Sequence, residues 1–173
     1  MTETEEIFDV VNSRDMVIDR LPRSQVHARN LLHRSVHALV FDADQRVFLQ
    51  LRTDDRDCDP GLWDSSVGGH LQAGEDYDNA IVREAKEELG IVLESTPPRL
   101  FKLSASEDTA YEFCWVYQVF DDGPFQLDSN EAADGRWFTA QEISDWITNA
   151  PQTITSSFRL IWKNYLEIRF GND

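Results

Sequence analysis

The feature that most constrains the fold of this chain is segment 76–89, whose pattern predicts an amphipathic helix. Gly90 follows it, and glycine readily takes the left-handed conformation that ends a helix. The apolar side chains of the segment gather on one face at helical spacing; they are Ile81, Val82, Ala85 and Leu89. We therefore expect this helix to cover one face of a β-sheet.

Segments rich in β-branched and aromatic residues predict the strands of that sheet. We expect a hairpin at 8–11 and 16–19, one or two helical turns within 23–32, a hairpin at 35–41 and 46–51, an exposed loop at 53–62, strands near 66–67, 99–105, 111–120 and 135–138, and helices at 140–148 and 155–168. The strands and helices do not alternate regularly, so the pattern favours an α+β fold, an αβα sandwich with a mixed sheet. A length of 173 residues suits a single domain.

The net charge of −16, from 32 acidic against 16 basic residues, limits the partners of the chain. Such a surface repels nucleic acid polymers and anionic membranes. It also repels a phosphate-bearing substrate unless a cation lies between them. No apolar run approaches the ~20 residues that span a bilayer, and the acidic N-terminus does not resemble a signal peptide. We expect a cytoplasmic protein without a membrane segment, and Cys58 and Cys114 have no metal-binding or redox spacing.

Three carboxylates of the predicted helix point to metal chemistry. Glu84, Glu87 and Glu88 are spaced i, i+3, i+4, which places them within an arc of roughly 100° on one helix face. Like charges this close destabilise a helix, and Arg83 cannot neutralise all three. A hard divalent cation can, since carboxylate oxygens suit Mg²⁺ or Mn²⁺.

The segment around these glutamates resembles the signature of the Nudix hydrolase family. The family pattern is Gly, five residues, Glu, seven residues, then Arg-Glu-aliphatic-any-Glu-Glu-any-Gly-aliphatic. This chain matches it with Gly69, Glu75, Arg83, Glu84, Ala85, Glu87, Glu88, Gly90 and Ile91. With average residue usage, a chance match at all nine positions is on the order of 10⁻⁷. The resemblance implies metal-dependent hydrolysis of a diphosphate bond in a small substrate, either nucleoside diphosphate-linked or a related organic diphosphate.

The resemblance also implies roles for individual residues. Glu84 and Glu88 would be the main metal ligands, assisted by Glu87 and the carbonyl of Gly69. Glu75 would orient the helix, and Arg83 would pair with its glutamates. Glu131, six residues before Trp137, would be a further ligand or the general base, a role for which Glu84 and Glu87 compete. The Nudix domain would cover residues 34–173, with residues 1–33 as an extension packed on it.

A second resemblance, in the N-terminal half, is to the isopentenyl-diphosphate isomerase branch of the same family. It rests on His33 before the first core strand, on the Pro-Gly-x-Trp loop that ends at Trp63, and on Ser66-Val67 before Gly-His. The isomerase uses a cysteine at the position of Gly68, so this chain lacks that thiol. Its metal-binding histidines would match His27, His33 and His70, and one of its two strand glutamates would match Glu112, whereas Ala110 stands at the other.

Several alternatives remain open at this point. The four histidines are spread along the chain, so a second metal site is one interpretation, and structural hydrogen bonding is the other. We expect His70, and Trp63 in the preceding loop, to contact the substrate. The competing functions are isomerisation of isopentenyl diphosphate and a non-catalytic module that senses nucleotides. The family resemblance allows a homodimer.

Overall fold

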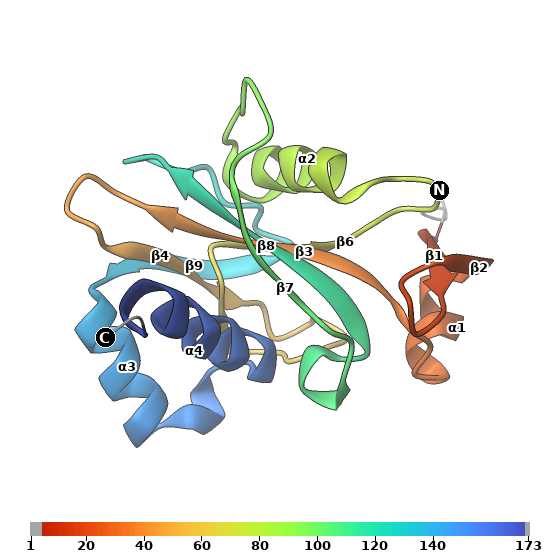
Figure 1. Ribbon diagram of the computed structural model, residues 1–173. Helices are drawn as coiled ribbons and strands as arrows, with labels where there is room; N and C mark the ends of the chain where they lie inside the picture. Colours follow the sequence, from red (N-terminus) through yellow and green to blue (C-terminus); the bar gives the residue numbers. More distant parts are fainter. Residues whose placement is uncertain (1–4, 172–173) are drawn as a thin grey trace.

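The computed structural model describes residues 5–171 and has the αβα architecture that the sequence predicts (Figure 1). A seven-stranded mixed sheet forms the middle layer. Its strands are β3 (His33–Phe41), β4 (Val47–Arg52), β5 (Trp63–Asp64), β6 (Val67–His70), β7 (Arg99–Leu103), β8 (Glu112–Phe120) and β9 (Ala132–Phe138). Helix α2 (Tyr77–Leu89) covers one face, and α3 (Ala140–Asn149) and α4 (Ser156–Phe170) cover the other. Short 3₁₀ turns lie at Glu107–Thr109 and Pro151–Thr153.

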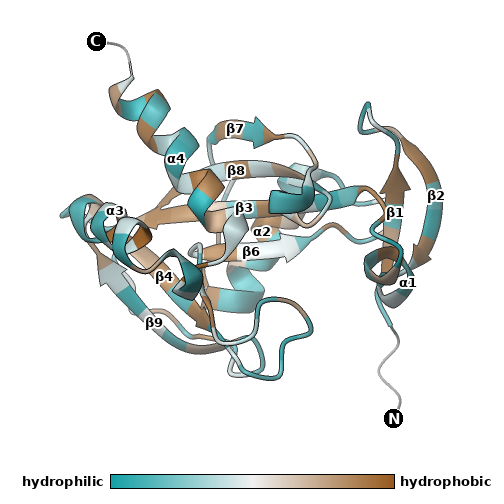
Figure 2. Cartoon of the chain, turned by 90° about the horizontal axis from the view of Figure 1, so that it is seen from below, coloured by the Kyte–Doolittle hydropathy of each residue, from teal (hydrophilic) through white to brown (hydrophobic). Residues whose placement is uncertain are grey.

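Two hydrophobic clusters hold the layers together. One lies between the sheet and α2 and includes Val36, Val40, Ile81, Ala85 and Leu89. The other lies between the sheet and the two later helices, around side chains such as Phe158, Ile161 and Trp162 of α4. In Figure 2, α4 alternates between hydrophobic and hydrophilic colour along its length, as an amphipathic helix that buries one face should.

The hairpin predicted for 35–41 and 46–51 exists, but its strands part immediately after the turn. β3 and β4 are antiparallel, and Phe41 with Val47 is the pair that joins them. Beyond it, β3 pairs with β6 on one side and runs parallel to β8 on the other, while β4 pairs with β9 and β5. The parting of β3 and β4 lets β6 lie next to β3, which brings its two glycines below α2.

The N-terminal residues form a small layer of their own at one end of the sheet. β1 (Ile7–Val11) and β2 (Val17–Pro22) make a two-stranded sheet, and α1 (Arg23–Ala28) packs on it through Val26 and Phe8. Asp15, in the turn between the strands, accepts hydrogen bonds from Arg34 Nε at 2.6 Å and from the Tyr77 hydroxyl at 2.7 Å. These contacts fix the small sheet against β3 and α2.

The boundaries of α2 follow from its two ends. The Asp76 side chain accepts a hydrogen bond from the backbone N–H of Asn79 at 2.8 Å, which caps the first turn. Gly90 ends the helix with φ of 72°, as its position in the sequence predicts. No helix among residues 5–171 is both long enough and apolar enough to cross a membrane.

Candidate active site

The glutamates of α2 are not equally exposed. Glu84 and Glu88 are buried, with 7% and 4% of their surface exposed, whereas Glu87 lies at the surface. Gln50 on β4 donates a hydrogen bond to Glu88 Oε2 at 2.7 Å, and the Gly68 N–H lies 3.3 Å from the same oxygen. The helix therefore points the Glu88 carboxylate into the gap between β4 and β6.

Burial raises the pKa of both carboxyls. For Glu84 the loss of solvent outweighs the attraction of Arg83 and raises the pKa to about 7. For Glu88 the same loss, together with repulsion from Glu84 and Glu131, raises the pKa well above its ordinary range. Carboxylates that repel one another in a buried place are suited to a divalent cation, which supplies the charge that water cannot. The residues present thus fit a metal ion of the kind predicted from the sequence.

Arg83 connects more of the site than its spacing indicates. Its guanidinium donates to Glu75 at 2.8 Å, to Glu84 at 2.7 Å and to Glu87 at 2.8 Å. It also donates to the backbone carbonyl of His70 at 2.9 Å. The family resemblance implies pairing of Arg83 with the helix glutamates, and folding also brings Glu75 and the end of β6 within reach. Arg83 therefore locks α2 to the loop before it and to the sheet.

The two glycines of β6 leave room for the side chains on either side of the strand. A Cβ atom on Gly69 would lie 2.1 Å from the carboxyl carbon of Glu84. A Cβ atom on Gly68, on the opposite face, would lie 2.9 Å from the ring of His37. Glu84 thus rests directly on the backbone of Gly69, the residue whose carbonyl was predicted as a ligand.

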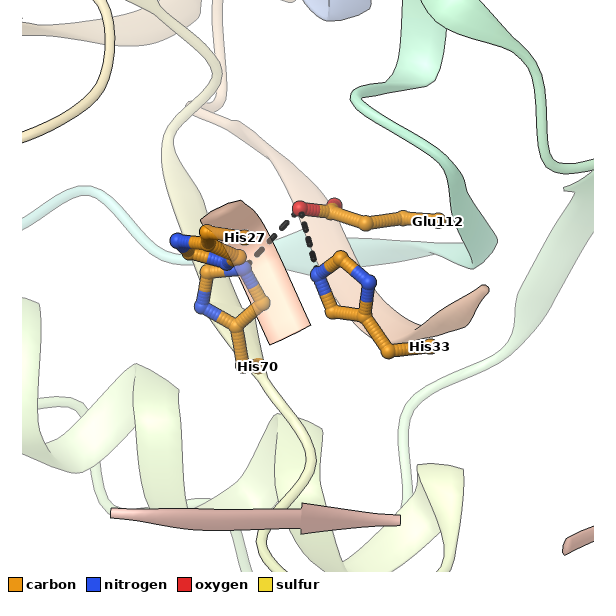
Figure 3. Close-up of side chains that lie close together, drawn as sticks. All are labelled: His27, His33, His70 and Glu112. Carbon is orange, nitrogen blue, oxygen red and sulfur yellow. Dashed lines mark hydrogen bonds and ion pairs between the residues drawn. The ribbon is translucent and has the colours of Figure 1, made fainter. Parts of the chain in front are cut away.

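A second cluster of possible metal ligands lies beside the first, and it joins four elements of the fold (Figure 3). One ligand atom from each of His27 in α1, His33 in β3, His70 in β6 and Glu112 in β8 lies within 4.8 Å of the others. His70 Nε2 is 2.9 Å and His33 Nε2 is 3.5 Å from the same oxygen of Glu112. The spacing of these histidines in the sequence did not show whether they lie together, and the structure makes them neighbours in space.

The protonation of this cluster also fits a cation. His33 Nδ1 donates to the carbonyl of Leu31 at 2.8 Å, which leaves Nε2 as the nitrogen that could bind a metal ion. That buried nitrogen has no hydrogen-bond partner among the described residues, although it faces a carboxylate oxygen. Burial and the neighbouring His70 and His33 lower the pKa of His27 to about 4, which keeps its ring neutral. Three imidazoles with one carboxylate are a donor set for Zn²⁺, Mn²⁺ or a related ion.

Two adjoining cavities lie at these clusters. The larger, about 250 Å³, contains the histidine cluster and the guanidinium groups of Arg23, Arg52 and Arg56. The smaller, about 20 Å³, lies against Glu88 and Glu131. Both are lined by the same four residues, Arg52, Arg56, Asp64 and Gly68. An elongated ligand that filled the larger cavity would thus end beside the glutamates.

Arg56 has features of an anion-binding residue that the sequence did not single out. Its Nε is buried without a hydrogen-bond partner among the described residues, and its Nη1 lies 3.3 Å from Glu131 Oε1. The chain has few basic residues, so an arginine within the acidic loop 53–62 was the feature of the sequence that could have singled out Arg56. Gln50 and His37 were also missed, because their sequence positions are those of ordinary strand residues.

Trp63 lines neither cavity. Its indole packs edge-on against Phe138 and Trp146, with ring centroids 5.5 Å apart in each case, and it belongs to the core beneath α3 and α4. The structure gives Trp63 a packing role, and its contact with a substrate stays a prediction without support from the cavities. His70 lines the larger cavity, where Glu112 holds it, and its contact with a substrate stays a prediction.

Comparison with known proteins identifies the family and the fold of the chain. The chain matches the NUDIX domain family over residues 31–158. It is 30% identical over 144 residues to isopentenyl-diphosphate Delta-isomerase 1 of Photorhabdus laumondii, covering 80% of this chain and 82% of that one. It is 40% identical over 121 residues to an uncharacterized Nudix hydrolase of Streptomyces coelicolor, covering 69% and 66%. Among solved structures, DR0079 from Deinococcus radiodurans superimposes with a TM-score of 0.82 at 26% identity, over 91% of this chain and 98% of that one.

Proposed function

Because this chain belongs to the NUDIX domain family and is a Nudix hydrolase, acting on acid anhydrides, we propose that it cleaves the diphosphate bond of a small nucleoside diphosphate-linked or related organic diphosphate. Nudix hydrolases act on pyrophosphate-containing substrates and generally use divalent metal ions. The observation that carries the proposal is the pair of buried carboxylates, Glu84 and Glu88, of which Glu88 lines a cavity together with Arg52 and Arg56.

Glu84 and Glu88 would hold Mg²⁺ or Mn²⁺, with the Gly69 carbonyl and the more exposed Glu87 as further ligands. When bound, such an ion neutralises phosphate oxygens and lowers the pKa of a coordinated water. Arg83 keeps the helix in register with β6 through Glu75 and the His70 carbonyl. Arg56 offers a free Nε to a phosphate oxygen, which balances the repulsion of the acidic surface.

Glu131 is our candidate for the general base. It lines the same small cavity as Glu88, whereas Glu84 and Glu87 are both occupied by Arg83. A carboxylate in that place is positioned to take a proton from the attacking water. Its partner Arg56 would shift toward the substrate phosphates and so release it.

The experiment is a metal-dependent assay of phosphate and pyrophosphate release. The panel contains nucleoside triphosphates, nucleotide sugars, dinucleotides and isoprenoid diphosphates, with Mg²⁺ or Mn²⁺. Glu88→Gln should lower turnover roughly 100-fold or more while the fold is retained. The matched control is Glu94→Gln, at an exposed position, which should keep full activity. A fully active Glu88→Gln variant would exclude the proposal.

Isomerisation of isopentenyl diphosphate is the second candidate. It is favoured by the cluster of His27, His33, His70 and Glu112 and by the relative that carries the isomerase name. Gly68 weighs against it, because the isomerase cysteine has no counterpart here and the ring of His37 occupies the space above that glycine. Interconversion of the two five-carbon diphosphates by the purified protein would decide in its favour.

A further inference from the structure

His37 has no part in the chemistry described above, yet it lines the larger cavity and contacts Gly68, which borders both cavities. It follows His33 and Ser35 on the same face of β3, is 7% exposed, and lines the larger cavity. Its ring lies so close above Gly68 that no other residue type fits there without a shift of the ring. The position of this imidazole is therefore set by the backbone beneath it.

Ser65 fixes which ring nitrogen of His37 carries the proton. The Ser65 hydroxyl donates to the carbonyl of Val67 at 3.0 Å, and a carbonyl can only accept. With its single proton used, the hydroxyl must accept at its contact with His37 Nδ1, 2.5 Å away. Nδ1 is thus the protonated nitrogen, and Nε2 of the neutral ring has a free lone pair. No group of residues 5–171 donates a hydrogen bond to Nε2.

The lone pair on His37 Nε2 lies where the organic part of a substrate would be placed. His37 lines the larger cavity, its partner Ser65 lines the smaller one, and Gly68 borders both. A diphosphate placed along Arg52 and Arg56 would have its attached group next to His37. Most of the residues that line this cavity have polar or charged side chains, and Val26 and Ala110 are its aliphatic members.

We propose that His37 is a specificity-determining residue, whose Nε2 accepts a hydrogen bond from a hydroxyl on the organic group of the substrate. A hydroxyl on a sugar ring that is attached directly to the diphosphate would be close enough to His37 Nε2 to donate to it. The inference rests on the proposed function, since it places the diphosphate beside Glu88. A substrate without that hydroxyl leaves a buried acceptor unpaired, which lowers its affinity.

Binding of analogues that resist hydrolysis tests the inference separately from turnover. The probes are α,β-methylene uridine diphosphate and its 2′,3′-dideoxy counterpart, measured by calorimetry with Mg²⁺ present. The wild-type protein should prefer the hydroxylated analogue by about tenfold. His37→Leu should remove the preference by weakening the hydroxylated analogue alone. Ser65→Ala should reduce it, because the proton is then free to move to Nε2.

His37→Gln is a second variant for the case in which His37→Leu does not fold. The amide oxygen of the glutamine can still accept a hydrogen bond, so this variant should keep part of the preference for the hydroxylated analogue. Equal binding of the two analogues by the wild-type protein, no binding of either, or an unchanged preference in His37→Leu would each overturn the inference. Hydrolysis of unmodified diphosphates without this preference would overturn it and leave the proposed function standing. A preference for the hydroxylated analogue without hydrolysis of any diphosphate would support the inference and exclude the proposed function.

Discussion

Gln50 on β4 donates one amide proton to Glu88 Oε2 and the other to the Ser66 carbonyl, both at 2.7 Å. Both protons of the amide are therefore used, and the side chain has one orientation available. Since Glu88 comes from α2 on the other side of the gap, this pair determines where the carboxylate points. A strand residue thus orients a ligand that a helix supplies.

Gln50→Leu should weaken binding of Mn²⁺ about tenfold, because a ligand that loses its outer hydrogen bond loses its orientation. Titration of the purified variant with Mn²⁺, followed by electron paramagnetic resonance, measures the free ion directly. Gln118→Leu is the matched control, since Gln118 lies on β8 and lines neither cavity. Equal affinities for the wild-type protein and Gln50→Leu would show that Glu88 does not need this partner.

The raised pKa of Glu84 predicts how the stability of the metal-free protein changes with pH. The folded carboxyl titrates at about 7 against an ordinary 4.5, so between these values the folded state holds a proton that the unfolded chain has released. The free energy of unfolding must then fall as pH rises through this window. From pH 5 to pH 8 this group should lower Tm by about 5 °C.

The Glu84→Gln variant isolates this contribution, because every other titrating group is shared with the wild-type protein. Thermal unfolding of both proteins with a chelator should show the steeper decline for the wild type. Saturating Mg²⁺ should raise the wild-type Tm more at pH 8 than at pH 5, since the ion binds the ionised form. Parallel curves for the two proteins would mean that burial does not perturb Glu84.

Much of the fold was predictable because each element carries a local signal. The helix of α2 follows from its apolar face and from Gly90, and the strand β8 from its run of β-branched and aromatic residues. The parting of β3 from β4 was not predictable, since it depends on β6, β8 and β9 as partners. Pairing between distant strands has no signature in either strand alone.

The site residues also divide into those that the local sequence predicts and those that only the folded structure brings together. Glu84, Glu87 and Glu88 lie within one helix, so their spacing predicts their proximity. Gln50, Arg56 and His37 reach the site through tertiary structure, and nothing in their neighbours along the chain marks them. The histidine cluster is intermediate, because only the resemblance to the isomerase branch indicated that His27, His33 and His70 belong together.

The two clusters should hold separate ions. After dialysis against Mn²⁺, metal analysis of the wild-type protein should find two ions per chain, and His27→Ala and Glu88→Gln should each lose one. His27 is the chosen ligand because it is less buried than His33, so its removal disturbs the fold least. Loss of both ions in either single variant would indicate one shared site.

Gly69→Ala should separate metal binding from stability. The new Cβ would overlap the Glu84 carboxyl group, which lies at the end of a flexible side chain and can move away. The fold should therefore survive, while affinity for Mn²⁺ falls about tenfold because Glu84 has left its place. Gly68→Ala instead meets the ring of His37 and should cost about 2 kcal/mol. Adding His37→Ala should restore that stability, and an unrelieved double variant would argue against the contact.

Asp15 should matter for stability although it is far from the carboxylates of α2. Its side chain, 11% exposed, accepts from Arg34 and Tyr77 and also pairs with Lys102, which ties the turn between β1 and β2 to the main sheet. Asp15→Asn keeps the shape and tolerates the positive φ of 59°, but it loses the charge that these cations face. Urea unfolding should show a loss of about 2 kcal/mol, against less than about 0.5 kcal/mol for Asp19→Ala in the exposed strand β2. Equal effects of the two substitutions would mean that the small sheet is held by Phe8 and Val26 alone.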